Sequence, residues 1–337
     1  MVCTIKVEES LKKKEAIFLD TRSPKEYAED CLPGAISIPI FNNEERAIVG
    51  TIYKQVSQEK AVEQGLEFFS KNLPHIIKII NQFKDKELIV YCWRGGMRSK
   101  VIVSLLEAMN YRVWQLEGGH KAFRQYVREK LDHYILKPKI VVLWGLTCTG
   151  KTELIQQFPQ SLDLEGLAQH RGSLYGALGL IPSSQKKFDN LFLQRLEELN
   201  NEPYIIVEGE SRKIGDVQIP EFFYRAMKNG IPILVKKSIE QRAIYGAQVY
   251  LNDKTIEEVK KISAGLQRLI SKEKKEELAK LLDNREYDAA CKILLQFYYD
   301  QLYEHTLNRI RFLAEINNET IEQGKEELKK TLKKIFI

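Results

Sequence analysis

A reactive thiol is the first chemistry that this sequence offers. Residues 92–99 read CWRGGMRS, so a cysteine opens a segment that holds two glycines and two arginines. A loop of this kind between a strand and a helix gathers unpaired backbone N–H groups and the positive end of the helix dipole. That field favours thiolate over thiol and holds an oxyanion beside it. We predict that Cys92 is catalytic. We also predict that the oxyanion beside its thiolate is bound by Arg94, Gly95, Gly96 and Arg98.

The alternative for Cys92 is a buried structural cysteine, which is a common role for free cysteines. Packing alone requires neither Gly95-Gly96 nor two arginines within six residues of the thiol. The spacing Cys-x5-Arg-Ser leaves the reaction open, because protein phosphatases and arsenate reductases use such a loop and sulfurtransferases use a closely similar one. We therefore favour a reactive cysteine without assigning its reaction from the spacing.

A phosphate-binding loop is the second feature. Residues 145–152 read GLTCTGKT and match the pattern Gly-x4-Gly-Lys-Thr. An apolar strand is expected at 139–144 and a helix from Glu153, which is the order that such a loop requires. Backbone N–H groups would cradle a diphosphate, Lys151 would pair with its oxygens, and Thr152 would ligate Mg²⁺. The predicted diphosphate-binding residues are Gly145, Thr147, Thr149, Gly150, Lys151 and Thr152.

Acidic residues follow the next predicted strand. Residues 204–207 lead into Glu208, and Glu210 stands two positions later. Either carboxylate suits the acid that faces Mg²⁺ across a phosphate site, and the candidate metal ligands are Thr152 and Glu208. An ordinary solvated pair is the alternative for His170 and Arg171. The predicted substrate contacts are Asp163, Glu165, His170, Arg171, Ser173, Glu208, Glu210 and Arg212.

Strands and helices must alternate to position these loops. Strands are predicted at 17–20, 88–91, 139–144, 204–208 and 231–235, with a helix beginning at Ser99. This alternation predicts an α/β fold with a doubly wound parallel sheet in the phosphate-loop domain.

A length of 337 residues predicts about two domains. Pro138 marks a short linker near residues 131–139. We expect the cysteine-loop domain at 1–135, the phosphate-loop domain at 136–250 and a helical C-terminal region at 251–337. One apolar helical face is predicted there from Ile256, Val259, Ile262, Leu266 and Leu269.

Four motifs of the first domain occur in the order typical of a rhodanese domain, which residues 1–130 resemble. They are Asp20-x-Arg22, the segment 32–39, the Cys92 loop and the segment 113–119. The resemblance puts Cys92 in the place of the persulfide-forming cysteine. Asp20 and Arg22 are expected to have a structural role in a buried polar network.

A rhodanese-like domain followed by a phosphate-loop domain resembles the tRNA 2-selenouridine synthases. The resemblance spans about residues 15–250. One departure is Cys148, which stands where relatives more commonly carry glycine, but the defining phosphate-loop residues remain, so diphosphate binding is expected to persist. The resemblance is carried by the two loops, by residues 43–46 (NEER), 163–165 (DLE), 170–173 (HRGS) and 208–212 (EGESR), and by Ile214-Gly215.

The resemblance implies a two-step exchange at the wobble uridine of certain tRNAs. Geranyl diphosphate first alkylates the sulfur of 2-thiouridine; selenophosphate then supplies selenium, and the geranyl thiol leaves. The phosphate loop would hold the leaving diphosphate without ATP, and the Cys92 loop would hold selenophosphate. The implied partners are tRNA and selenophosphate synthetase, the source of the selenium donor. Whether Cys92 carries selenium covalently or only stabilises its transfer stays open.

Composition agrees with a nucleic-acid substrate without proving it. The formal net charge is +6, a mild excess that a phosphate backbone would attract. Five cysteines without paired spacing fit a reducing cytoplasm better than a disulfide framework or a zinc site. With no signal peptide or membrane-spanning apolar run in the sequence, we expect a cytoplasmic protein that has no membrane partner.

Two other functions stay open. The first is a Cys-x5-Arg phosphatase fused to a nucleotide-binding domain, although Tyr91 stands where those phosphatases usually place histidine. The second is an ATP-dependent tRNA thiolation enzyme or RNA kinase, in which the rhodanese-like part only delivers sulfur. Turnover of p-nitrophenyl phosphate would support the first, and ATP hydrolysis stimulated by tRNA would support the second.

Overall fold

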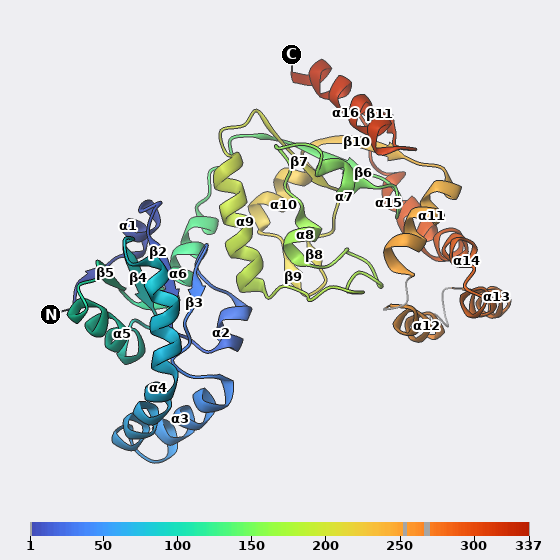
Figure 1. Cartoon of the computed structure of the whole chain (residues 1–337). Helices are drawn as coiled ribbons and strands as arrows, with labels where there is room; N and C mark the ends of the chain where they lie inside the picture. The colour runs from blue at the N-terminus through green and yellow to red at the C-terminus, as the bar shows by residue number, and fades with distance from the viewer. Residues whose placement is uncertain (1, 252–254, 266–269, 337) are drawn as a thin grey trace. The chain divides into compact units, whose positions relative to one another are not determined.

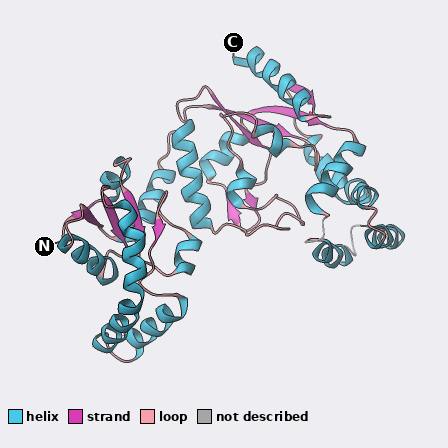
Figure 2. Ribbon diagram, in the orientation of Figure 1, coloured by secondary structure: helices cyan, strands magenta, loops and turns pink. Residues whose placement is uncertain are grey.

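The computed structural model describes residues 2–251, 255–265 and 270–336 (Figure 1). The chain divides into two compact units, Met1–His133 and Tyr134–Ile337. Each unit combines helices with a parallel sheet, as Figure 2 shows by colour, so the predicted α/β class is confirmed. None of the described helices is long and apolar enough to cross a bilayer.

The sheet of the first unit has the order β1-β5-β4-β2-β3, and all neighbouring strands are parallel. Its central strand β4 is buried along its whole length, which explains its continuous apolar sequence. Cys92 directly follows this strand. The strands are β1 (Thr4–Ile5), β2 (Ile17–Asp20), β3 (Ile36–Ser37), β4 (Leu88–Tyr91) and β5 (Val113–Leu116); the helices are α1 (Val7–Lys12), α2 (Pro24–Glu29), α3 (Asn43–Gln55), α4 (Gln58–Ile80), η1 (Asn81–Phe83), α5 (Met97–Ala108) and α6 (Gly119–Asp132).

Helices α4 and α5 pack against one face of this sheet. Ile80 of α4 and Leu106 of α5 share a buried core with Leu88 and Val90 of β4. Helix α5 begins at Met97, two residues before the predicted start, because Gly96 occupies the N-cap position. The earlier start leaves Ser99 inside the first turn of the helix, where its side chain can reach back to the loop.

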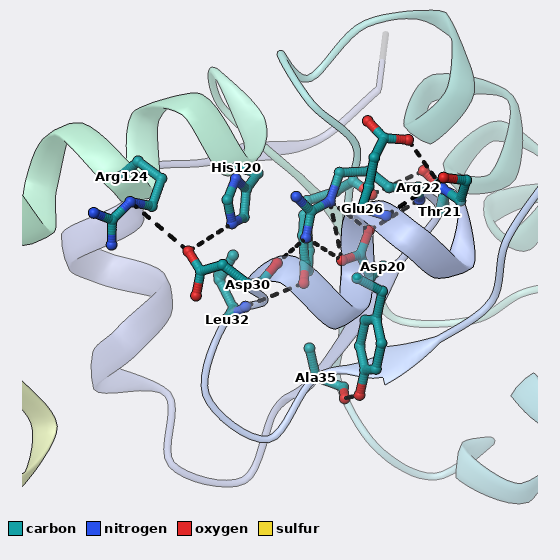
Figure 3. Close-up of polar contacts among 12 residues, drawn as sticks. Asp20, Thr21, Arg22, Glu26, Asp30, Leu32, Ala35, His120 and Arg124 are labelled. Carbon is teal, nitrogen blue, oxygen red and sulfur yellow. Dashed lines mark hydrogen bonds and ion pairs between the residues drawn. The ribbon is translucent and has the colours of Figure 1, made fainter. Parts of the chain in front are cut away.

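A buried polar network holds the strand ends of this unit together (Figure 3). Asp20 and Arg22 form an ion pair at 2.6 Å, with side chains only 0% and 2% exposed. Arg22 also donates to the backbone carbonyl of Asp30 at 2.6 Å. The carboxylate of Asp30 lies 3.1 Å from His120 Nε2 and 3.7 Å from Arg124 Nε of α6. The structural role predicted for Asp20 and Arg22 is the one that the structure gives them.

The second unit has a four-stranded parallel sheet in the order β11-β10-β6-β7. Strand β6 pairs with β7 on one side and with β10 on the other. The chain therefore continues to both sides of β6, and the direction of the strand order reverses there. Ligands of doubly wound sheets bind beyond the carboxyl ends of the strands at such a reversal, and β6 runs into the phosphate loop there. The strands are β6 (Lys139–Trp144), β7 (Tyr204–Glu208), β8 (Lys213–Ile214), β9 (Val217–Gln218), β10 (Ile231–Lys236) and β11 (Ala314–Asn317), of which β8 and β9 form a separate antiparallel pair.

Helices cover both faces of the four-stranded sheet, so the predicted doubly wound arrangement is confirmed. Leu154 of α7 and Leu328 of α16 share a buried core with Leu143 of β6. On the opposite face α10 packs against β6, and its Phe223 meets Phe192 of α9 edge to face. The helices are α7 (Lys151–Ile155), α8 (Leu164–Ala168), α9 (Gln185–Leu199), α10 (Glu221–Lys228), α11 (Ile239–Tyr250), α12 (Ile256–Ala264), α13 (Lys272–Asp283), α14 (Tyr287–Leu294), η2 (Leu295–Tyr299), α15 (Asp300–Leu307) and α16 (Ile321–Phe336).

The C-terminal region is helical as predicted, except for a strand that the sequence reasoning missed. Strand β11 pairs in parallel with β10 and thereby extends the phosphate-loop sheet. It has four residues, of which only Ile316 is buried, so its pattern is too short to stand out. The predicted apolar face begins on α12, whereas Leu266 and Leu269 lie outside the described residues.

We expect the Asp20–Arg22 pair to dominate the electrostatic stability of the first unit. Arg22→Met leaves the buried Asp20 carboxylate without its ion-pair partner, and breaking a buried pair in this way costs about 3–5 kcal/mol. Urea unfolding of the full chain measures the loss. The control is Lys86→Met, which removes an exposed pair with Glu15 that is worth less than about 1 kcal/mol. Equal losses in the two variants would contradict the assignment.

Candidate active site

The thiol of Cys92 lies at the end of the central strand of the first unit and is 3% exposed. Its sulfur accepts a hydrogen bond from the backbone N–H of Gly96 at 3.2 Å and one from the Ser99 hydroxyl at 3.3 Å. Burial opposes ionisation, but the hydrogen bonds from Ser99 and the charge of Arg98 outweigh it and hold the pKa of the Cys92 thiol below its ordinary value. The site is therefore built to stabilise a thiolate.

Close backbone packing fixes the shape of the Cys92 loop. Gly95 has a φ of +65°, and a Cβ there would lie 2.8 Å from the Leu116 carbonyl oxygen. The amide of Gln115 on β5 donates to the carbonyl oxygens of Gly95 and Gly96 at 2.9 and 3.2 Å and to the Ser99 hydroxyl at 2.8 Å. These bonds tie the loop and the first turn of α5 to β5. Sequence reasoning missed Gln115 and Ser99, because their roles depend on neighbouring strands and turns.

The two arginines of this loop have different surroundings. Arg98 donates to the Glu26 carboxylate at 3.2 Å, and Arg46 lies 3.7 Å from the same carboxylate. Burial opposes ionisation of Glu26, but Arg98 above all holds the pKa of its carboxyl below the ordinary value. Arg94 is exposed. Of the two guanidinium groups predicted to bind an anion, Arg98 is thus already engaged by a carboxylate and Arg94 faces solvent.

The phosphate loop joins β6 to α7. Gly150 occupies the N-cap of α7 with a φ of +76°, and a Cβ there would lie 2.9 Å from Asn318 Nδ2. Lys151 curls over the loop and donates to the carbonyl oxygens of Gly145 and Leu146 at 3.0 and 3.3 Å. The side chain therefore already lies over the space that a diphosphate would fill.

Two side chains from later in the chain hold the phosphate loop from outside. Arg242 of α11 donates to the Thr147 carbonyl at 2.8 Å and forms a two-point ion pair with Asp300. Asn318, directly after β11, donates to the Thr149 carbonyl at 2.7 Å. The C-terminal region offered no motif in the sequence, yet it supplies Asn318 and also Asp300, the ion-pair partner of Arg242.

Cys148 has a left-handed backbone, with a φ of +66°. Glycine adopts this conformation most easily, so the structure gives a physical reason for the glycine expected at this position. Cysteine is accommodated here with its side chain directed toward α11, where its sulfur would lie 3.0 Å from a Cβ on Gly246.

Carboxylates gather beside the phosphate loop. Thr152 donates its hydroxyl hydrogen to Glu165 at 3.0 Å. Burial, followed by the neighbouring charge of Glu165, raises the pKa of Glu210 to about 8, and the two carboxyl groups share a hydrogen bond. Burial, followed by the charges of Asp163 and Glu165, raises the pKa of Glu208 well above its ordinary value. Both shifts favour the protonated form of these carboxyl groups.

The two candidate acids at the carboxyl end of β7, Glu208 and Glu210, differ in position. Glu210 lines the cavity at the phosphate loop, whereas Glu208 is fully buried and accepts from the backbone N–H of Leu164 at 3.4 Å. Within residues 2–251, 255–265 and 270–336, no three acidic, histidine or cysteine side chains converge as a ready-made metal cluster.

The remaining predicted contacts divide into two groups. Asp163, Glu165, Arg171 and Ser173 line the same cavity as Lys151. His170 instead packs under glycine backbone, since a Cβ on Gly176 or Gly215 would lie 2.6–2.8 Å from its ring. Arg212 forms an exposed ion pair with Glu221 at 2.8 Å. Thr149 directs its hydroxyl to the Leu146 carbonyl at 2.9 Å, inside the loop.

The cavity at the phosphate loop has a volume of about 600 Å³. Its lining combines the loop backbone, Lys151 and carboxylates with aromatic and aliphatic side chains from β6, α10, α11, α15 and the segment before α9. The rings and aliphatic groups are Trp144, Leu180, Tyr224, Tyr245, Val249, Tyr250, Tyr303 and Leu307. Such a mixed lining suits a ligand that has both a charged group and an apolar body.

The fold and its two loops define a protein with a rhodanese domain and a P-loop domain in one chain. Residues 5–126 match the family model of the rhodanese-like domain, and residues 138–281 match that of the tRNA 2-selenouridine synthase AAA domain. The chain belongs to the tRNA 2-selenouridine synthase family.

Curated relatives of that name include one from Nitrosomonas europaea, with 37% identity over 66% of this chain and 60% of the relative. Another, from Hydrogenovibrio crunogenus, is 29% identical over 88% of this chain and 90% of the relative. The chain thus spans about three fifths of the Nitrosomonas protein. A solved rhodanese-related protein from Thermoplasma volcanium is 20% identical, with a TM-score of 0.25, covering 37% of this chain and 92% of that one.

The depressed pKa of Cys92 makes its alkylation depend on pH in a defined way. Only the thiolate reacts, so the rate falls as pH drops through the pKa, and we expect this midpoint below the ordinary value for cysteine. Ser99→Ala should raise the midpoint by about one to two pH units, because a hydrogen bond to a charged group is worth about 1.5–3 kcal/mol. Iodoacetamide labelling at several pH values, read by peptide mass spectrometry, gives both midpoints.

Two controls accompany this measurement. Ser104→Ala changes an exposed serine on the same helix and should leave the Cys92 midpoint where it is. Cys31 is read in the same digest; burial and then the charge of Asp30 raise the pKa of its thiol, so its midpoint should lie above the ordinary value. A Cys92 midpoint no lower than that of Cys31 would contradict the thiolate site.

Proposed function

We propose that this protein converts 2-thiouridine at the wobble position of tRNA to 2-selenouridine through an S-geranyl intermediate. The observation that carries the proposal is the presence, in a chain of this family, of a thiolate loop together with a P-loop cavity whose lining includes aromatic and aliphatic side chains. The proposed substrates are tRNA, geranyl diphosphate and selenophosphate, with selenophosphate synthetase as the source of the selenium donor. We propose the cytoplasm as its location.

The P-loop cavity would serve the first half-reaction. The sulfur of 2-thiouridine attacks C1 of geranyl diphosphate, a carbon–sulfur bond forms, and the carbon–oxygen bond to diphosphate breaks. Lys151 and the backbone N–H groups of the loop would bind the departing diphosphate, whose charge grows as the bond breaks. The geranyl chain would lie against aromatic side chains of the cavity lining, which include Tyr245 and Tyr303. This reaction requires no ATP.

Mg²⁺ fits the carboxylate side of this cavity. The ion usually keeps several waters and uses one or two carboxylates beside phosphate oxygens, so it needs no ready-made protein cluster. Thr152 with Glu165 and Glu210 would hold it, since all three line the cavity and the cation would take the place of the hydrogen that the two carboxyl groups share. Bound there, Mg²⁺ would neutralise charge on the leaving diphosphate.

The Cys92 loop would serve the second half-reaction. Selenophosphate is a tetrahedral oxyanion, for which this loop offers backbone N–H groups and the exposed guanidinium of Arg94. The selenium of selenophosphate bonds to C2 of the uridine, and the carbon–sulfur bond breaks as geranyl thiol leaves. Water then cleaves the selenium–phosphorus bond, which releases inorganic phosphate. Cys92 would stabilise this transfer through its thiolate. Covalent transport of selenium as a perselenide would need a two-electron oxidant in addition, because selenophosphate supplies selenium at the selenide level.

Purified protein tests the proposal directly. Thiolated tRNA, geranyl diphosphate and selenophosphate are supplied, and the nucleosides are measured by mass spectrometry. We expect the S-geranyl nucleoside with geranyl diphosphate alone and 2-selenouridine with both co-substrates. Absence of both products would refute the proposal. Hydrolysis of p-nitrophenyl phosphate would then favour a phosphatase, and tRNA-stimulated ATP hydrolysis would favour an ATP-dependent thiolation enzyme.

Cys92→Ser should abolish 2-selenouridine formation while S-geranyl nucleoside accumulates. The reason is that serine stays protonated at neutral pH, so the loop loses its thiolate, whereas the P-loop is unchanged. The matched control is Cys3→Ser, which alters an exposed cysteine of the same unit and should leave both products at their normal yield. Normal 2-selenouridine formation by Cys92→Ser would show that Cys92 is not catalytic.

Lys151→Ala should slow geranyl transfer by about one to two orders of magnitude or more, because a hydrogen bond to a charged group is worth about 1.5–3 kcal/mol. Gly150→Val should slow it further, since its branched side chain meets Asn318 at a positive φ. Lys187→Ala, an exposed lysine on α9, is the control and should keep the normal rate.

Selenation of tRNA supplied already S-geranylated separates the two half-reactions. We expect Lys151→Ala to carry out this step normally once tRNA binding is matched. Loss of the step at equal tRNA affinity would contradict the division of labour and assign the P-loop a part in selenium transfer as well.

A further inference from the structure

Two cysteines meet behind the P-loop of the second unit. Cys148 belongs to the loop and Cys291 to α14, and their thiols are hydrogen-bonded to each other. Gly246 of α11 leaves the room for this contact: a Cβ there would lie 3.0 Å from the sulfur of Cys148 and would collide with that of Cys291. Both cysteines are free in the structure. The three residues come from three separate elements, so the contact is a tertiary feature.

The surroundings make the two thiols unequal. The hydrogen bond from Cys291 and the charges of Arg242 and Lys151 hold the pKa of Cys148 below its ordinary value, although burial opposes them. The hydrogen bond to Cys148, followed by burial, raises the pKa of Cys291. Of the two thiols, Cys148 is therefore the one that loses its proton more easily.

Cys148 is also the thiol that a small reagent can reach. It lines the cavity of about 600 Å³ at the P-loop, whereas Cys291 is 6% exposed and does not line that cavity. Both cysteines border a second cavity of about 20 Å³, enough for about one water molecule. A peroxide molecule would therefore meet Cys148 from the P-loop cavity, with Cys291 directly behind it.

We propose that Cys148 and Cys291 form a reversible disulfide under oxidation by hydrogen peroxide, and that this bond switches the P-loop to a state that binds anions weakly. The switch goes beyond the proposed activity. The expected change in diphosphate affinity rests on the proposed diphosphate site. The formation of the Cys148–Cys291 disulfide does not depend on that site.

The reaction has two steps. The Cys148 thiolate attacks one oxygen of hydrogen peroxide, the O–O bond breaks, and a sulfenic acid and hydroxide result. The Cys291 thiol then attacks the Cys148 sulfur, the S–O bond breaks, and water leaves with the thiol proton. The two sulfurs together lose two electrons, which reduce one peroxide molecule.

The position of Cys148 explains why the bond should act on the loop. Its neighbours Thr147 and Thr149 are held by Arg242 and Asn318 through their carbonyl groups. A disulfide brings the sulfurs to about 2.05 Å, much closer than a hydrogen bond between thiols. The Cys148 side chain must therefore move toward α14 while both flanking residues stay anchored. The resulting strain falls on the backbone N–H groups that cradle the anion.

The test uses the full chain with inorganic diphosphate as the probe. Protein treated with hydrogen peroxide is digested without reduction, and we expect one peptide pair joined through Cys148 and Cys291 that dithiothreitol separates. Calorimetry should show diphosphate binding to the reduced protein, a loss of affinity of about tenfold or more after oxidation, and recovery with dithiothreitol. Failure of the reduced protein to bind diphosphate would count against the proposed P-loop site and leave the cross-link result to decide the disulfide.

Three variants sharpen the result. Cys148→Gly suits the positive φ and should make diphosphate affinity insensitive to peroxide. Cys291→Ala removes the resolving thiol, so peroxide should oxidise Cys148 further and dithiothreitol should no longer restore binding. Cys92→Ser should keep the full reversible effect. Peroxide treatment that leaves Cys148 and Cys291 unlinked, cross-linking without a change in affinity, or an equal response from Cys148→Gly would each overturn the proposal.

Discussion

The turn from a buried parallel strand into a helix is the constraint on which both sites depend. In each unit the central parallel strand ends at the carboxyl-end edge of the sheet. The helix that packs back on the sheet must then begin within a few residues of that strand end. That tight turn forces left-handed backbone at Gly95 in one loop and at Cys148 and Gly150 in the other. It also directs backbone N–H groups into the loop, where they act on a thiolate in one unit and suit a phosphate group in the other.

Such a turn leaves carbonyl groups that need partners, and the two units satisfy them in the same way. In the first unit Gln115 of β5 donates to two carbonyls of the Cys92 loop. In the second, Arg242 and Asn318 donate to two carbonyls of the P-loop. Because these donors come from neighbouring elements, the loops are held in shape by the tertiary fold and not by their own sequence.

Much of this could be predicted from local pattern. The strands at 17–20, 139–144 and 204–208 were placed correctly, because buried parallel strands are continuous apolar runs bounded by loops. Strand β11 was missed, since four residues with one buried side chain carry too little pattern. Helix α5 begins at Met97, whereas the sequence predicts its start at Ser99. The difference arises because a glycine N-cap gives a weaker sequence signal than serine or aspartate.

The sequence by itself determined the two anion-binding loops, since glycines at fixed spacing, a cysteine and a lysine define them locally. Only the tertiary structure decided which side chains surround those loops. In the folded chain the Ser99 hydroxyl donates a hydrogen bond to the Cys92 sulfur, and Arg98 pairs with Glu26. Glu210 lines the P-loop cavity, whereas Glu208 is buried. The physical reason is that loop conformation follows from short-range backbone geometry, whereas burial and charge pairing depend on residues far apart in the chain.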